Sequence, residues 1–470
     1  MVVGLISAPT SGDIIPPAMK DMTRGPILGH ILGMAAFIAL STMFQTLYLL
    51  VDLYFVGRLG KEAIAGVGMA GNLTFLVLAL TQALGVGTTA LIAQALGRKD
   101  RDHAELLFNQ ALVLSVAVGI AFFVAAFLTR ETYCVRLAAD APTATLGKQY
   151  LNWYIPALCL QFILVAMGAA LRGLGDIKIP TLIQIATIVV NIVLAPVLIF
   201  GWGTGHAFGV AGAAMASFFA ILLGLVAMIA YFEHEKSHLR IRVAQWPPRL
   251  ALWGGILKIG GPAGGEFVLL AVYLTIVYVI IKPFGAAAQA GFGVGGRLMQ
   301  SMFLPAVAIA FATSPVAGQN FGARLGSRVR QSFYASASLT GAVMLVLTLL
   351  CHIAPEAMIR LFNDDPAVVA FGAEYLRIIS WNFVASGVVF VSGAVFQAMG
   401  NTLPPLLSSS TRLLLFAAPA VWISHRPDFH MRQLWHLSVV AVTLQMLFNM
   451  ALLRREFKRK LNFDEAPLRG

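Results

Sequence analysis

The chain is a succession of long apolar stretches, each of roughly 20 to 30 residues, separated by short polar loops. A helix of that length crosses a hydrocarbon layer about 30 Å thick, because each residue adds about 1.5 Å. The stretches lack the alternating pattern of barrel strands, and backbone groups inside a bilayer must bond to one another, so helices are predicted. Because only 11% of the residues are charged, an ordinary soluble domain is excluded.

We predict an all-α membrane protein with about twelve transmembrane helices. Their ends are placed from the apolar runs alone. The spans lie near residues 28–56, 64–96, 104–128, 147–171, 179–201, 208–232, 252–282, 287–320, 330–352, 368–398, 404–424 and 432–453.

Charge in the loops indicates the orientation of the chain in its membrane. About 20 Lys and Arg lie in the termini and the even-numbered loops, against about 10 in the odd-numbered loops. The positive-inside rule therefore predicts a multi-pass protein of the bacterial inner membrane with both termini cytoplasmic. It also accounts for the net charge of +12 without a nucleic-acid partner. The segment before the first span lacks the pattern of a cleavable signal peptide.

The two halves of the chain match each other at an offset of about 225 residues. "GAALRGLGDIKIP" in the first half corresponds to "GAVFQAMGNTLPP" in the second, and Gln94 and Gly97 correspond to Gln319 and Gly322. Six helices per half is an even number, so we expect two six-helix bundles related by a pseudo-two-fold axis along the membrane normal, with a central cleft. The predicted segments are an N-terminal segment 1–25, a first bundle 26–232, a cytoplasmic linker 233–251, a second bundle 252–453 and a basic tail 454–470.

Six short motifs then resemble one known family. They are "VDLYFVGRLGKEAIAGVG", "ALGVGTTALIAQALGRKD", "ALRGLGDIKIP", "NIVLAPVLIFG", "GVAGAAMAS" and "VAGQNFGAR". In this order they resemble the multidrug and toxic compound extrusion (MATE) antiporters, over roughly residues 26 to 455. The resemblance implies a V-shaped pair of bundles that exports organic cations and other amphipathic compounds in exchange for protons or sodium ions, by alternating access.

Asp52 is a carboxylate inside an apolar span. A charge at that depth costs about 2.5 to 3.5 kcal/mol on insertion scales, so such residues face a bundle interior or an aqueous cavity. Gln45, Tyr48 and Asp52 share one helix face. The resemblance assigns ion coupling to the acid of this first-helix motif. The alternative is a structural acid paired with an arginine or a helix N-terminus.

Asn191 and Ser217 are further candidates for ion coupling. The family pattern places an acid four residues after the asparagine, and here that position is Ala195. A sodium site benefits from several oxygens and from carboxylate charge, so we expect protons as the coupling ion, with sodium at Asp52 and Asn191 as the alternative. Both polar residues could instead serve as hydrogen-bonding contacts between helices. No cofactor is expected.

Glu266 is a second acid within a span, near Pro262, which is expected to bend its helix. Some MATE proteins use second-half acids for coupling, but those positions do not carry over cleanly to this chain. Two interpretations stay open. Glu266 belongs to a cation or substrate site, or it is buried against Arg297 or Arg412.

Methionine and aromatic side chains suit a cavity that accepts varied organic cations. The candidates are Met34, Met43, Phe44, Met69 and Phe267. Most such residues in a membrane protein only pack against neighbours or lipid. We expect small organic cations or drugs and membrane lipid as partners, and a monomer.

Three other functions compete with drug export. A lipid-linked sugar flippase of the same wider superfamily usually has extra helices and an arginine-lined cavity. A major-facilitator transporter would carry a "GxxxDRxGRR"-like loop, and here the loop reads "ALGRKDRDHA". An enzyme would need clustered catalytic or metal-binding groups, but most histidines fall in loops, and Cys134, Cys159 and Cys351 have no paired spacing. We therefore expect no enzymatic activity.

Overall fold

The computed structural model describes residues 21–463 apart from 139, 204, 235–238 and 363. Every regular element of this part of the chain is helical. The long helices are α1 (Ile27–Gly57), α2 (Lys61–Gly97), α3 (Arg101–Leu137), α4 (Ala141–Leu174), α5 (Lys178–Phe200), α6 (Gly209–His234), α7 (Leu250–Ile281), α8 (Ala286–Gly322), α9 (Gly326–Ile353), α11 (Pro366–Ile379), α12 (Asn382–Ala398), α13 (Leu403–Ser424) and α14 (Met431–Lys460). The short ones are α10 (Pro355–Arg360) and two 3₁₀ turns, η2 (Val243–Gln245) and η3 (Lys282–Phe284).

The predicted all-helical membrane fold is confirmed. Within the described residues, 11 helices are long and apolar enough to cross a bilayer, and the pair α11–α12 supplies a twelfth crossing if it counts as one span. These two helices occupy the region predicted as a single span over 368–398, and they meet at an angle of 55°.

No proline lies at the break between α11 and α12, and the break contacts α9. The carbonyl of Ser380 accepts from the Phe383 backbone N–H at 3.0 Å. The Thr348 hydroxyl of α9 lies 2.9 Å from this carbonyl and 2.9 Å from the Met344 carbonyl of its own helix. Trp381 packs edge-on against the ring of His352, also on α9, with centroids 5.0 Å apart. Contacts with another helix, which sequence periodicity does not show, therefore accompany this bend.

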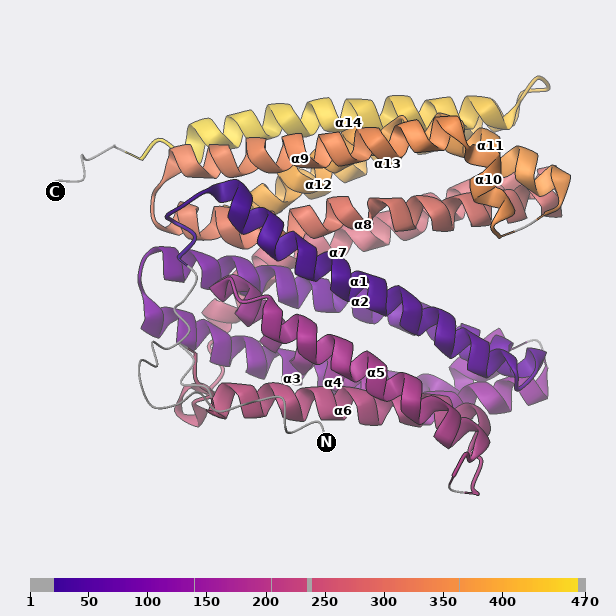
Figure 1. Cartoon of the computed structure of the whole chain (residues 1–470), viewed down its shortest axis with the longest axis horizontal. Coiled ribbons are helices and arrows are strands. Elements are labelled where there is room, and N and C mark those ends of the chain that lie inside the picture. The colour runs from indigo at the N-terminus through magenta and orange to yellow at the C-terminus, as the bar shows by residue number, and fades with distance from the viewer. Residues whose placement is uncertain (1–20, 139, 204, 235–238, 363, 464–470) are drawn as a thin grey trace.

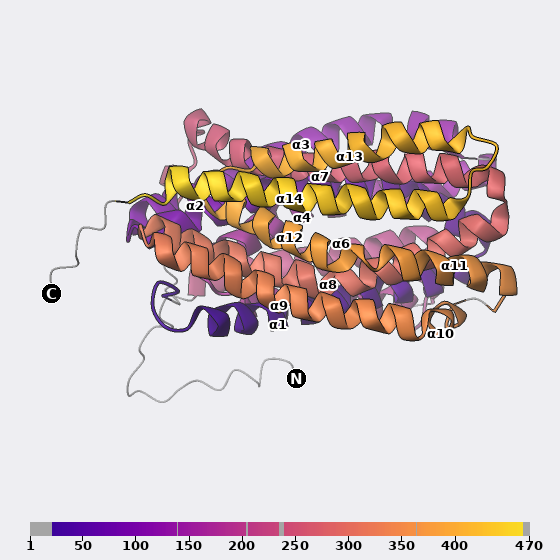
Figure 2. The ribbon, with the colours of Figure 1, turned by 90° about the horizontal axis from the view of Figure 1, so that it is seen from above.

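The helices form two lobes, one from each half of the chain. We call α1–α6 the N-lobe and α7–α14 the C-lobe. Figure 1 shows them as two layers, with α1 running diagonally between the layers and both described ends of the chain on the left. The view from above shows helices of the C-lobe, among them α14 and α9, on the near side of the molecule (Figure 2).

The backbone shows the same internal repeat as the sequence. Lys99 and Arg324 are equivalent under the repeat, and both have φ of 60°, a left-handed conformation that is uncommon outside glycine. Gly60 and Gly285 also share positive φ values, 112° and 88°, at the starts of α2 and α8. The duplicated halves therefore share turn geometry as well as helix order.

Glycines bring the two lobes into backbone contact at the end where the described chain begins. A Cβ atom on Gly97 would lie 2.1 Å from the carbonyl oxygen of Gln319, and one on Gly322 would lie 2.1 Å from that of Gln94. The two contacts are equivalent under the repeat. Along α7, a Cβ on Gly260 would lie 1.5 Å from the Ala83 oxygen of α2. These crossings hold α2 directly against α7 and α8.

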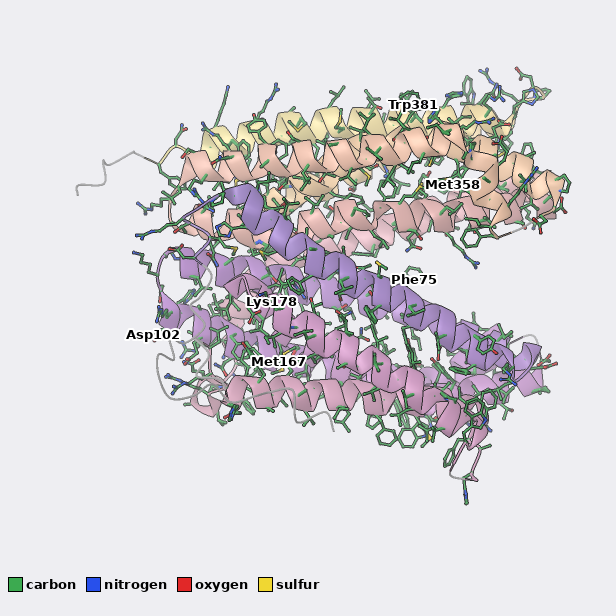
Figure 3. The ribbon with its side chains drawn as sticks, in the orientation of Figure 1. Phe75, Asp102, Met167, Lys178, Met358 and Trp381 are labelled. Atoms are coloured by element: carbon green, nitrogen blue, oxygen red, sulfur yellow. The ribbon has the colours of Figure 1, made fainter. Side chains whose placement is uncertain are left out.

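The first helix of each half packs in both lobes. The start of α1 packs into a hydrophobic core of the C-lobe, which contains Ile31 and Met34 together with Ala312 of α8. The end of α1 packs into a hydrophobic core of the N-lobe, which contains Val56. Helix α7 does the reverse, with Ile259 near its start beside Ala90 of α2. On the N-lobe side, Lys178 of α5 lies 5.8 Å from the ring centroid of Phe37 on α1 (Figure 3).

Polar contacts fasten the segment before α1 to the C-lobe. Met22 is fully buried, and its backbone N–H donates to Gln319 Oε1 at 3.1 Å. Its carbonyl accepts from Asn320 at 3.0 Å and from Arg328, which also donates to the Gly25 carbonyl. The start of α1 is thereby held at the end where the lobes touch.

We expect Gly97→Ala to destabilise the protein, because the new methyl group must displace the backbone of α8. Overpacking of this kind typically costs about 1–3 kcal/mol. The check is the thermal unfolding midpoint of the purified protein in detergent, with Gly341→Ala as the matched control, since a Cβ at Gly341 meets nothing within 4 Å. Equal midpoints for the two variants would contradict the close contact.

Candidate functional site

Asp52 lies inside the N-lobe on the second half of α1. Its Oδ1 is buried and has no hydrogen-bond partner among the described residues. The carboxyl group interacts electrostatically with Tyr48, Tyr150 and Tyr154, which lie on α1 and α4. Arg58, the nearest arginine along the helix, lies instead 5.4 Å from the ring centroid of Phe200. Asp52 therefore has three tyrosines in its electrostatic surroundings and forms no ion pair within the described part of the chain.

Ser217 of α6 connects three helices of the N-lobe. Its hydroxyl donates to the Ala213 carbonyl at 3.3 Å. The Asn191 amide of α5 donates to Ser217 Oγ at 3.1 Å, and the Tyr48 hydroxyl lies 3.1 Å from the same oxygen. Since the only proton of Ser217 is already used, Tyr48 donates to it. The structure thus brings Tyr48, Asn191 and Ser217 together, and Asp52 follows Tyr48 by four residues on α1.

Ala195 is buried in the N-lobe core beside this cluster and offers no ligand oxygen. The described residues contain no group of three or more His, Cys, Asp or Glu side chains placed to hold a metal ion. Among the residues that the structure describes, Asp52 is therefore the only carboxylate of this cluster that is available to bind a cation.

The other predicted cavity residues of the N-lobe are dispersed. Gln45 and Met43 are exposed, and Phe44 is half-buried. Met34 is buried in the core between α1 and α8, and Met69 is buried in the core that includes Ala63 and Tyr150. Tight packing therefore fills the space around Met34 and Met69, and neither lines the described cavity.

A cavity of about 290 Å³ opens inside the C-lobe. Glu266 and Phe267 of α7 line it, together with Arg412 of α13. Its other walls come from α8, α12 and α14, and Gln82 and Val86 of α2 close it on the N-lobe side. Of the two arginines considered as neighbours of Glu266, Arg412 shares this cavity, whereas Arg297 is exposed and does not line it.

Several polar residues of this cavity were not singled out from the sequence. Gln445 of α14 donates to the Ser409 hydroxyl at 3.2 Å, and both line the cavity. Tyr273 lies next to it, with its hydroxyl 3.3 Å from Ser438. The internal repeat offers a signal, because Tyr273 is the second-half counterpart of Tyr48. The repeat locates Tyr273 alone, because the counterparts of Asn191 and Ser217 are Phe416 and Val442.

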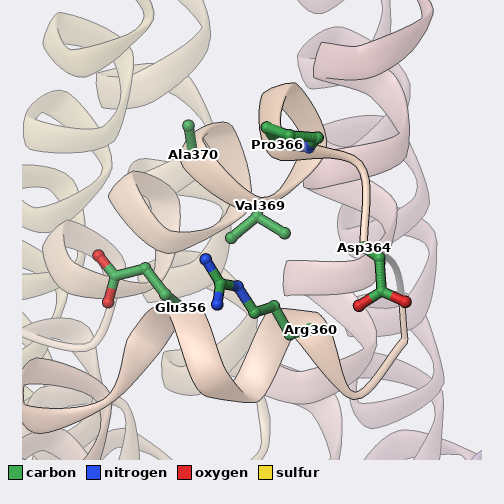
Figure 4. A pocket seen from close by; sticks show the side chains of 6 residues that line it. All are labelled: Glu356, Arg360, Asp364, Pro366, Val369 and Ala370. Carbon is green, nitrogen blue, oxygen red and sulfur yellow. The ribbon is translucent and has the colours of Figure 1, made fainter.

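A second depression, of about 450 Å³, lies at the turn between α10 and α11 (Figure 4). Its walls carry Glu356, Arg360 and Asp364. Glu356 is already paired with Arg377 at 2.7 Å. None of the predicted site residues lines it, so we do not assign the functional site there.

A family model described as MatE matches the chain twice, over residues 38–197 and 262–423, once in each half. The chain belongs to the MatE family. The second match is displaced from the first by nearly the offset of the internal repeat. The resemblance read from the six motifs is thereby confirmed, and the chain is a multi-pass member of a multidrug efflux transporter family.

Relatives of this MatE chain are transport proteins. "Probable multidrug resistance protein YoeA" of Bacillus subtilis is 25% identical over 87% of this chain and 90% of that protein. The "FAD transporter" of Shewanella oneidensis is 24% identical over 85% and 89% of the two chains. "Multidrug export protein MepA" of Staphylococcus aureus is 23% identical over 82% and 85%.

Solved MATE structures share the fold of the whole chain. One, in complex with MaL6, superposes with a TM-score of 0.88 at 21% identity, covering 94% of this chain and 99% of that one. The outward-facing conformation of a multidrug resistance MATE family transporter gives a TM-score of 0.87 at 21% identity, covering 94% and 98%. The two-lobed architecture described above is thus that of the MATE fold.

We expect Ser217→Ala to destabilise the N-lobe, because it leaves the Asn191 amide and the Tyr48 hydroxyl without their acceptor. A buried donor without a partner costs about 1–3 kcal/mol. Ser217→Thr keeps the hydroxyl and serves as the matched control. The measurement is again the unfolding midpoint in detergent. An alanine variant as stable as the threonine variant would show that the hydroxyl oxygen is dispensable.

Proposed function

We propose that this MatE protein is a secondary active antiporter that exports amphipathic organic cations in exchange for protons. Asp52 is the coupling group, and Tyr48, Asn191 and Ser217 hold its surroundings. The single observation that carries the proposal is the buried Asp52 carboxyl with an unpartnered oxygen and no ion pair in the described chain.

The geometry of Asp52 suits a group that takes up and releases a proton. A proton can bind Oδ1 without breaking a hydrogen bond to the described protein. In the charged state, the same carboxylate attracts an organic cation, and the rings of Tyr150 and Tyr154 offer it aromatic faces. Protonation removes that attraction and releases the organic cation. The same site thus binds the organic cation and the proton in turn.

Sodium is the alternative coupling ion. The small number of available oxygen ligands favours protons over sodium. A sodium ion needs several oxygen ligands and gains from carboxylate charge. Ala195 supplies no oxygen, and the Ser217 oxygen already accepts two hydrogen bonds while its proton is donated to Ala213. A proton needs only the free oxygen of Asp52.

Alternating access follows from the two-lobed packing. The lobes touch through α2, α7 and α8 at the end that holds the described chain termini. We place that end in the cytoplasm, in accordance with the basic residues of its loops, and the protein in the inner membrane. Rocking one lobe against the other would then open the N-lobe site to each side in turn.

We expect Asp52→Asn to reduce proton-driven efflux to the level of empty vesicles, because the amide cannot carry a proton across the cycle. The measurement is efflux of a fluorescent organic cation from proteoliposomes, with a proton gradient or a sodium gradient imposed separately. Asp102→Asn is the matched control, since Asp102 is exposed in the first turn of α3 (Figure 3).

Two outcomes would contradict the proposal. Undiminished efflux by Asp52→Asn would remove Asp52 from the coupling step. Efflux by the unaltered protein under a sodium gradient alone would replace the proton by sodium. An unchanged unfolding midpoint of Asp52→Asn, compared with the unaltered protein, separates loss of coupling from loss of folding.

A further inference from the structure

The C-lobe cavity holds two side chains of opposite charge that do not pair. Glu266 and Arg412 both line the cavity and interact electrostatically. Their charged atoms are nevertheless more than 4 Å apart, since they form none of the ion pairs found among the described residues. Neither charge therefore has the close, well-aligned partner that a buried ion pair needs to offset its loss of hydration.

Arg412 is held in place while its hydrogen-bond donors remain unused. Its guanidinium carbon lies 5.1 Å from the centroid of the Tyr273 ring. That ring is fixed by packing against Phe416, with centroids 4.8 Å apart, and by the contact of its hydroxyl with Ser438. No hydrogen bond from Arg412 occurs within the described chain, although a guanidinium carries five N–H donors. The donors are therefore available to a ligand in the cavity.

The duplicated N-lobe lacks these two charges. Under the internal repeat, Glu266 corresponds to Ser41 and Arg412 to Thr187. Ser41 donates to Gln184 at 2.5 Å, and Thr187 donates to the Ile183 carbonyl of its own helix. Neutral, satisfied side chains thus occupy the equivalent positions. The two charges are a feature of the C-lobe cavity alone.

The remaining walls define the class of ligand. Phe267, Phe311 and Phe390 line the cavity, and Gln397 and Gln445 add polar groups. The volume of about 290 Å³ is near the lower end of the range for small-molecule sites. A guanidinium recognises a carboxylate through paired N–H donors, and a carboxylate attracts a cationic group.

We propose that the C-lobe cavity is a second ligand site, specific for amphipathic zwitterions, with Glu266 facing the cationic group and Arg412 binding the carboxylate. The proposal deepens the proposed function, on which it rests, by adding zwitterions to the exported class. It needs no proton movement at Asp52, so binding at equilibrium tests it separately from transport.

The test uses two dyes that differ only at one carboxyl group. Rhodamine 110 carries a free carboxylate and a cationic ring system, and rhodamine 123 is its methyl ester. Binding of each dye to the full-length protein in lipid nanodiscs is measured by fluorescence anisotropy without any ion gradient. We expect the unaltered protein to bind the free acid about tenfold more tightly than the ester.

Substitutions assign this preference to the two charges. Arg412→Gln should abolish the preference, because it should weaken binding of the free acid about tenfold and leave binding of the ester unchanged. Unchanged binding of the ester also shows that the variant is folded. Arg412→Lys should keep part of the preference. Glu266→Gln should weaken both dyes. Arg297→Gln, an exposed arginine of α8 outside the cavity, is the matched control and should change neither.

Three results would overturn the proposal. One is equal affinity of the unaltered protein for the two dyes. Another is an unchanged preference for the free acid in Arg412→Gln. The third is loss of binding of both dyes by Arg412→Gln and by Arg412→Lys, which would make Arg412 a packing residue. None of these results bears on proton coupling at Asp52, and failure of efflux in Asp52→Asn would leave the preference between dyes intact.

Discussion

Backbone contact between the two lobes is the constraint on which the arrangement of this protein depends. Gly97 and Gly322 allow α2 and α8 to meet at the distance of carbonyl contact, and Gly260 does the same for α2 and α7. Any larger side chain at these positions would separate the lobes. Because α2 is fixed in this way, α1 and α7 can each cross from one lobe to the other, and α1 carries Asp52 to the N-lobe.

Much of the fold could be predicted from the sequence, because apolar length and internal repetition are properties of the chain itself. The spans, the duplication and the lobed architecture all follow from them. The bend at Ser380 could not be predicted, since no proline marks it and the contacts at the break come from another helix, α9. Helix α3 continues to Leu137, past the predicted end at 128, because a helix can extend beyond its apolar run.

The candidate site was only partly predictable. Asp52 and Glu266 stand out because a carboxylate in an apolar span has few explanations, and the structure places them in an N-lobe cluster and a C-lobe cavity. The positions of Met34 and Met69 could not be predicted in this way. An apolar side chain fits a core as well as a cavity, so sequence could not separate the two. The sequence offered Arg412 only as one possible neighbour of Glu266, and its unused donors became visible only with the cavity around it.

The double membership of α1 has a mechanical consequence. Its first half is embedded in the C-lobe beside α8, with Met22 fastened in front of it, while its second half bears Asp52 among the N-lobe tyrosines. This helix is therefore anchored at its two ends in different lobes. In the proposed alternating motion, a displacement at Asp52 would be carried along about 20 helical residues to the opposite lobe.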